Sequence, residues 1–250
     1  MAKAATKSSG TGKPAARARP APKVSAPPPK RSWLHENGLS VALLSLFLFS
    51  VVGQALTGLA NENQELAEHG EPAITLIPYL LSGDFLSALF ENWESEFLQM
   101  WAYVMLTAYL FQKGSPESKS LYETNPEDRD PALDRRKSSA PWAVRQGGIV
   151  TVLYSHSLGF ALLGLFVLSF ALHWHNSLRA HVEEALQHNQ PPPEASAFLF
   201  DPQFWFESFQ NWQSEFLSTA VLVVLAIFLR ERGSPESKAV GQAHRKTGTV

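Results

Sequence analysis

The chain has 250 residues, of which 45% are hydrophobic and only 18% charged, and its formal net charge is −2. It contains no cysteine, which excludes a disulfide framework, a thiolate metal site and a cysteine nucleophile. The small net charge gives no electrostatic reason to expect a nucleic-acid partner.

Residues 1–31 form a basic segment built almost entirely of Ala, Pro, Lys, Arg, Ser, Thr and Gly. This composition cannot bury enough apolar surface to offset the entropy of ordering, so we predict a disordered tail. About 38 mostly polar residues precede the first apolar run, which argues against a cleaved secretory signal. The tail is either solvated, helping to set membrane topology, or a polybasic contact to anionic lipid.

Four apolar runs follow, and we interpret them as membrane spans. The first, 39–59, has no charged residue and is long enough for a helix to cross a bilayer core. The others are 97–111, about 149–174, and 216–229. The second and fourth are short, so we extend each backwards through Trp93 and Trp212, which suit the membrane interface. The predicted fold class is an all-α integral membrane protein with four transmembrane helices.

The basic residues predict the orientation of these spans. Of the 21 Lys and Arg residues, all except Arg179 lie before the first span, between the second and third, or at or after the end of the fourth. Basic residues collect on the cytoplasmic side of bacterial membrane proteins. We therefore predict that both termini and the central loop are cytoplasmic and that the two acidic loops face outward.

The sequence also repeats itself. Residues 34–119 match 153–238 without a gap at an offset of 119, and about 30 of the 86 aligned positions are identical. We interpret this as a tandem duplication of a two-span unit, which makes the two units parallel and disfavours an inverted-repeat transporter. The predicted division of the chain is a tail 1–31, a first repeat 32–119, a cytoplasmic linker 120–148, a second repeat 149–238 and a cytoplasmic tail 239–250. Two aromatic segments in the outer loops, 74–90 and 198–209, are expected to lie in the membrane interface.

The most specific motif, Asn-Trp-x-Ser-Glu-Phe-Leu, occurs once in each repeat, where the second and fourth spans begin. Its candidate functional residues are Asn92, Trp93, Ser95 and Glu96 in the first repeat and Asn211, Trp212, Ser214 and Glu215 in the second. One interpretation is an anchor at the membrane interface. The alternative is that Glu96 and Glu215 are partly buried, face each other, and bind a cation, a proton or a basic group of a partner.

A second motif, GSPESK, follows each returning span at 114–119 and 233–238. Gly114 and Gly233 suit the left-handed position that ends a helix, and the Pro two residues later prevents its continuation. The motif is either a simple helix stop or a structured turn that contacts a partner.

Histidines are the remaining candidates for chemistry. His173 and His175 lie near the outer end of the third span, and His181, Glu184 and His188 share one helix face, which would suit a metal ion. We consider solvated histidines the better interpretation and predict no metal site and no cofactor.

Nothing in the sequence indicates an enzyme, because it lacks a phosphate-binding glycine loop, a nucleophile elbow and a dinucleotide fingerprint. Two function classes stay open: a non-enzymatic scaffold that binds a partner or lipid, and a small ion or proton conductor that uses Glu96 and Glu215. Between 102–110 and 220–229 the uncharged polar side chains are Tyr103, Thr107 and Tyr109. A continuous hydrophilic path is therefore hard to draw, which favours the scaffold.

Three segments resemble a bacterial family of multi-pass membrane proteins catalogued only as a domain of unknown function. They are LHENGLS at 34–40, FENWESEFLQM at 90–100 and the glycine-containing stop at GSPESK. The resemblance covers about 32–238 and implies a multi-pass protein of the bacterial inner membrane. Its expected partners are the lipid bilayer and a membrane protein or second copy of the chain, with no nucleic acid; the resemblance implies no activity or catalytic residue.

Overall fold

The computed structural model describes residues 32–248, so the basic tail predicted to be disordered lies outside the described residues. Within them, the chain forms helices and turns but no β-strand. The described residues divide into two compact units between Ser50 and Val51, and this boundary lies within the first long helix. The expectation of an all-α fold is confirmed.

The first long helix, α1, runs Trp33–Glu68 and contains the charge-free run 39–59. Its part in the first unit has most of its large apolar side chains exposed, including Leu39 and Phe49 at 75% and 76%. A helix with this composition is stable in lipid, where the hydrocarbon covers such side chains and the backbone satisfies its own hydrogen bonds.

In the second unit, the short helix α2 (Leu76–Leu80) packs an aromatic side chain onto the start of α3 (Gly83–Tyr109). Tyr79 and Phe85 are buried together with Ala55 of α1, and the two rings lie 5.4 Å apart. The Ser82 hydroxyl accepts a hydrogen bond from the Phe85 amide at 3.2 Å and so caps α3. The segment 74–90 therefore does not form a helix of its own, because this cap starts α3 within it and the helix continues through Phe90.

The central linker contains only short helices before the next long one. Its elements are η1 (Pro126–Asp128), η2 (Pro131–Asp134), α4 (Trp142–Gln146) and α5 (Gly148–Ser155). The Arg135 guanidinium donates to the carbonyl oxygens of Arg145 and Gln146, which are the last backbone acceptors of α4. The long helix α6 then runs Ser157–Gln187. The expected single span over 149–174 is thus interrupted at His156, which separates α5 from α6.

The last elements, α7 (Ala195–Phe198) and α8 (Pro202–Phe228), repeat the arrangement of α2 and α3. Asp201 caps α8 by accepting from the Gln203 amide at 2.8 Å, and the rings of Phe198 and Phe204 lie 5.8 Å apart. Like its counterpart, the segment 198–209 does not form a helix of its own, because the cap and Pro202 start α8 within it.

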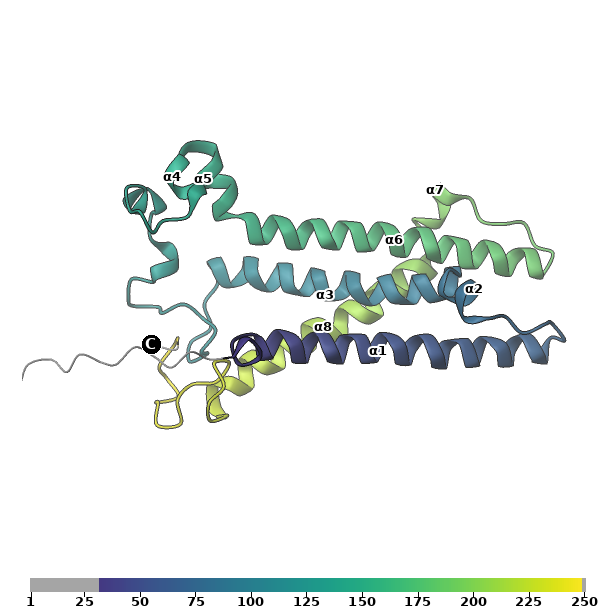
Figure 1. Ribbon diagram of the computed structural model, residues 1–250, viewed down its shortest axis with the longest axis horizontal. Coiled ribbons are helices and arrows are strands. Elements are labelled where there is room, and N and C mark those ends of the chain that lie inside the picture. Colours follow the sequence, from purple (N-terminus) through teal and green to yellow (C-terminus); the bar gives the residue numbers. More distant parts are fainter. Residues whose placement is uncertain (1–31, 249–250) are drawn as a thin grey trace, which may run out of the picture. The chain divides into compact units, whose positions relative to one another are not determined.

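Three helical segments are long and apolar enough to cross a membrane: Trp33–Glu68, Ser157–Gln187 and Ala195–Phe228. Within the second unit, α3 lies alongside α6 over most of its length and also contacts α8 (Figure 1). The three helices form a bundle whose two ends differ. We call the end at which α3 and α8 begin the α2/α7 end, and the opposite one the GSPESK end.

We predict that Gly83 is required for the contact between α3 and α6. A Cβ atom at Gly83 would lie 2.5 Å from the Ala180 amide nitrogen and 2.9 Å from the Asn176 carbonyl oxygen, both in the backbone of α6. Gly83→Ala should lower the free energy of unfolding by about 1–3 kcal/mol, measured by thermal or denaturant unfolding in detergent. Gly164→Ala is the matched control, since nothing lies within 4 Å of its Cβ. Equal stability of the two variants would contradict the packing.

Candidate functional site

A buried polar cluster joins α3, α6 and α8 in the half of the bundle nearer the α2/α7 end. Glu94 from α3 and His173 from α6 both have 0% exposure, and α8 contributes Glu207 and Trp212. Buried charged side chains are retained in proteins only when they are paired and hydrogen-bonded. Each member of the cluster therefore depends on its partners in the other helices.

The imidazole of His173 lies between two carboxylates. Its Nδ1 is 3.0 Å from Oε2 of Glu94, and its Nε2 is 3.6 Å from Oε2 of Glu207. The Trp212 indole N–H donates to the second Glu94 oxygen at 3.0 Å. Ser177 donates to Glu207 at 3.3 Å. Each of these contacts joins two different helices, so the network fixes how the three helices lie against each other.

The surroundings of the cluster are apolar and contain few compensating charges. The ring of Phe204, which has 0% exposure, lies 4.9 Å from the His173 ring, and Phe170 packs against Phe204 at 5.5 Å. Arg179 does not join the cluster, since it bonds to Asn176 and the Leu81 carbonyl oxygen. Among the residues described, no Lys or Arg bonds to Glu94, His173 or Glu207. The charge of the cluster thus depends on how many protons its three groups hold.

The structure brings only part of the predicted motif into this cluster. Trp212 belongs to it, and Asn211 donates to the neighbouring carboxylate of Glu91. Ser95 is buried and donates to the Asn92 carbonyl oxygen, and the exposed Ser214 donates in the same way to the Asn211 carbonyl oxygen. Both hydroxyls are therefore used within their own helices.

The expectation that Glu96 is partly buried is wrong: it is exposed, as is Asn92, whereas Glu215 is half-buried. Glu94, two residues before Glu96, takes the buried position instead, because successive helical residues are rotated by about 100° and only one of the two can face α6. Trp93, on a different face from Glu94, packs edge-on against the Phe90 ring at 5.4 Å.

Sequence reasoning missed Glu94, His173 and Glu207. Glu94 was passed over because Gln213 stands at the matching position of the second half. The expectation of solvated histidines is wrong for His173, although His175 and His188 are exposed. Within residues 32–248, no group of three His, Cys, Asp or Glu side chains is arranged to hold a metal ion.

Polar contacts continue along α3 towards the GSPESK end. Gln99 donates to the Thr219 hydroxyl and, at 3.3 Å, to the Glu215 carbonyl oxygen. One turn further on, the Tyr103 hydroxyl donates to the carboxylate of Glu117, in the loop after α3. Within the apolar stretch 102–110, the loop after α3 therefore supplies Glu117 as a polar partner of Tyr103.

The two GSPESK segments fold in the same way. In each, the second Ser accepts from the backbone at the start of the loop: Ser118 from Gln112 at 3.0 Å, and Ser237 from Glu231 at 2.9 Å. Both glycines are left-handed, with φ of 89° and 94°, as predicted. Their expected role as helix caps is wrong, because α3 and α8 end at Tyr109 and Phe228 and the glycines lie in the turns that follow.

The two loops differ in what they contact. Lys238 has 1% exposure and donates to the carbonyl oxygens of Gly114, His244 and Lys246, at 2.5, 2.8 and 3.2 Å. Burial, together with the charge of Arg230, lowers the pKa of Lys238. The segment after the second loop is thereby held against the first loop. The Gly114 amide adds a bond to the Thr247 hydroxyl at 2.9 Å.

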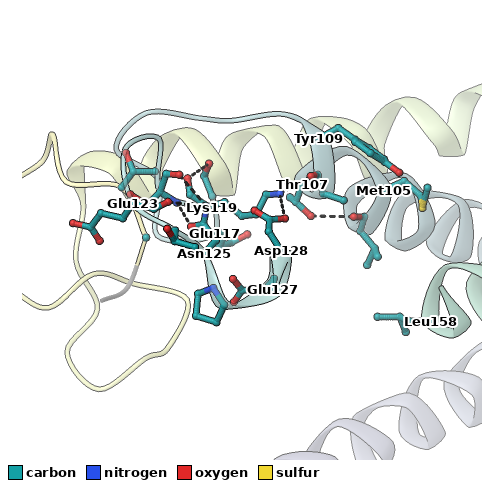
Figure 2. A pocket seen from close by; sticks show the side chains of 18 of the residues that line it. Met105, Thr107, Tyr109, Glu117, Lys119, Glu123, Asn125, Glu127, Asp128 and Leu158 are labelled. Atoms are coloured by element: carbon teal, nitrogen blue, oxygen red, sulfur yellow. Dashed lines mark hydrogen bonds and ion pairs between the residues drawn. The ribbon is translucent and has the colours of Figure 1, made fainter. Parts of the chain in front are cut away.

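The first loop also borders an open pocket of about 830 Å³ (Figure 2). Lys119 in this pocket donates to Asp128 and to the Ala108 carbonyl oxygen, each at 2.7 Å. Glu123 and Glu127 line the same wall. The one Lys of the pocket is therefore already paired, and the wall carries a net negative charge.

The model of a domain of unknown function, DUF6766, matches residues 30–249. No curated protein and no solved structure matches the chain. The matched region includes the whole buried cluster and both GSPESK loops, so these features lie within the family's own domain. The chain belongs to the DUF6766 family.

Proposed function

We propose that the protein is a four-span membrane protein, formed by tandem duplication, with both termini in the cytoplasm. Three apolar helical segments support membrane insertion, and the 27-residue α3 is long enough to be the fourth span. The duplication is supported by features that recur 119 residues apart, namely the capped starts of α3 and α8 and the hydrogen bonds of the GSPESK loops. The distribution of basic residues and the family resemblance support a bacterial inner membrane.

Within this architecture, the buried cluster best supports non-enzymatic proton exchange, as part of a small conductor or transporter. The observation that carries the proposal is the imidazole of His173 held between Glu94 and Glu207. Ionisable groups inside a membrane bundle are costly, and where they occur they mark ion or proton pathways. Glu94 and His173 are within hydrogen-bond distance, so a proton can pass between them without movement of the helices.

The polar contacts along α3 indicate the route that a proton would take from the cluster. From the cluster it would pass Gln99 and Thr219 and reach Tyr103 and Glu117 at the GSPESK end. Gaps between these pairs would be bridged by water, as in other buried polar routes. Glu96 and Glu215, the pair favoured by the motif, are a second proposed location for the same chemistry.

A second function, a scaffold that binds a membrane partner or lipid, is favoured by the exposed apolar side chains near the α2/α7 end. Ile77 and Leu81 are 65% and 62% exposed, and Phe200 and Phe206 are 80% and 61% exposed. These side chains suit contact with lipid or with another membrane protein. Purification from native membranes, with identification of bound proteins and lipids, tests this function; a clean monomer would count against it.

Proton exchange predicts a proton flux that depends on the cluster. Purified protein in liposomes containing a pH-sensitive dye, driven by a potassium diffusion potential, should acidify the lumen faster than empty liposomes. E94Q and H173Q, each checked for folding by thermal unfolding, should lower this flux about tenfold or more while they remain folded, because each removes one group of the relay.

The double variant E96Q/E215Q is the matched control and should keep the flux, since Glu96 is exposed. Loss of flux in E96Q/E215Q but not in E94Q or H173Q would place proton exchange at Glu96 and Glu215 instead of the buried cluster. Wild-type flux equal to that of empty liposomes would contradict proton exchange altogether.

The topology predicts the behaviour of reporter fusions. A fusion after Lys119 should report a cytoplasmic location and one near Glu71 a periplasmic location, because α3 crosses the membrane between them. Fusions on the same side at both positions would show that α3 does not span. A periplasmic location after Lys119 and a cytoplasmic one near Glu71 would contradict the proposed orientation of the spans.

A further inference from the structure

A cavity between α3 and α8 has a composition that the proton path does not explain. It has a volume of about 320 Å³ and lies in the half of the bundle nearer the GSPESK end. Most of its wall is apolar, formed by Ala102, Leu106, Phe111, Phe216, Ala220 and Val223. This size and lining are typical of sites for small organic molecules.

The polar groups of the cavity gather where it meets the first GSPESK loop. Tyr103 from α3 donates to one carboxylate oxygen of Glu117, and the other oxygen, Oε1, is buried with no hydrogen-bond donor in the described part of the chain. The carboxyl group of Glu236, from the second loop, is close enough to share a hydrogen bond with Glu117 and to act on it through its charge. Among residues 32–248, no Lys, Arg or His lines the cavity.

We propose that this cavity binds a lipophilic monovalent organic cation, such as a substituted ammonium ion, with Glu117 as its counter-ion. The Glu117 carboxylate supplies the charge, and the apolar wall holds the organic groups. The rings of Tyr103 and Phe216 line the cavity, and aromatic rings attract cations. The Phe111 ring already has the Lys119 amine 5.7 Å from its centre. A bare metal ion is not suited to the site, because it requires several oxygen ligands where one carboxylate oxygen is available.

Binding at this site should depend on pH near neutrality. Burial and the neighbouring charge of Glu236 raise the pKa of Glu117 to about 7. The groups facing Glu117 are Tyr103 from α3 and Glu236 from the second loop, while Lys119, two residues along the chain, is paired with Asp128. Glu117 is mostly neutral at pH 6 and mostly charged at pH 8, so the affinity for a cation rises with pH.

The test uses the full-length protein in nanodiscs and equilibrium dialysis with radiolabelled benzyltrimethylammonium. Its neutral isostere, neopentylbenzene, is the matched ligand, and empty nanodiscs give the background. The cation should bind about tenfold more tightly at pH 8 than at pH 6, following the ionised fraction of one carboxyl group with a pKa near 7. The isostere should show no such dependence on pH.

Two variants separate the role of Glu117 from a loss of folding. E117Q should abolish cation binding above background at both pH values, with folding checked by thermal unfolding. E236Q removes the neighbouring carboxylate, so it should retain binding and move the pH dependence to lower pH. Equal binding of the cation and its isostere would make the cavity an apolar groove and overturn the proposal, as would cation binding by folded E117Q. The proposal does not rest on the proton path, because the E94Q and H173Q variants should still bind the cation.

Discussion

The contact between Glu94 and His173 is the interaction on which the rest of the second unit depends. Glu94 and His173 lie in different helices and are 79 positions apart in the sequence, and both side chains are completely buried. Removal of one partner from such a pair leaves an uncompensated charge and costs about 3–5 kcal/mol. Replacement of the whole cluster by apolar residues of similar volume would avoid this cost. The cluster is therefore not required for stability alone.

The two ends of the bundle are stabilised by different means. At the α2/α7 end, an aromatic pair and a capping side chain fix the start of α3, and a second set does the same for α8. At the GSPESK end, the Ser hydroxyls and the buried ammonium of Lys238 satisfy backbone groups of the two loops and of the segment that follows the second loop. The buried cluster and the cavity between α3 and α8 lie between these two fixed ends, each with polar groups among apolar side chains.

Hydropathy and the repeat were sufficient to predict the helices and the equivalence of the two GSPESK turns, because both depend on local sequence. Helix starts were missed because Ser82 and Asp201 act through single hydrogen bonds that no hydropathy window detects. The buried acid was missed because retention in both repeats pointed to Glu96. A signal for Glu94 was nevertheless present, since Gly83 and Ser87, four residues apart and both buried, mark the face on which position 94 also lies.

The central claim, that the buried cluster exchanges protons, is tested most directly by the protonation state of His173 in a bilayer. Solid-state NMR of ¹⁵N-histidine-labelled protein in lipid, with the H173Q spectrum subtracted to assign the signals, reports that state. The account predicts that the His173 signals change between neutral imidazole and imidazolium as the pH is varied between about 5 and 9, with Glu94 and Glu207 intact. A single unchanged form of His173 across this range would contradict it.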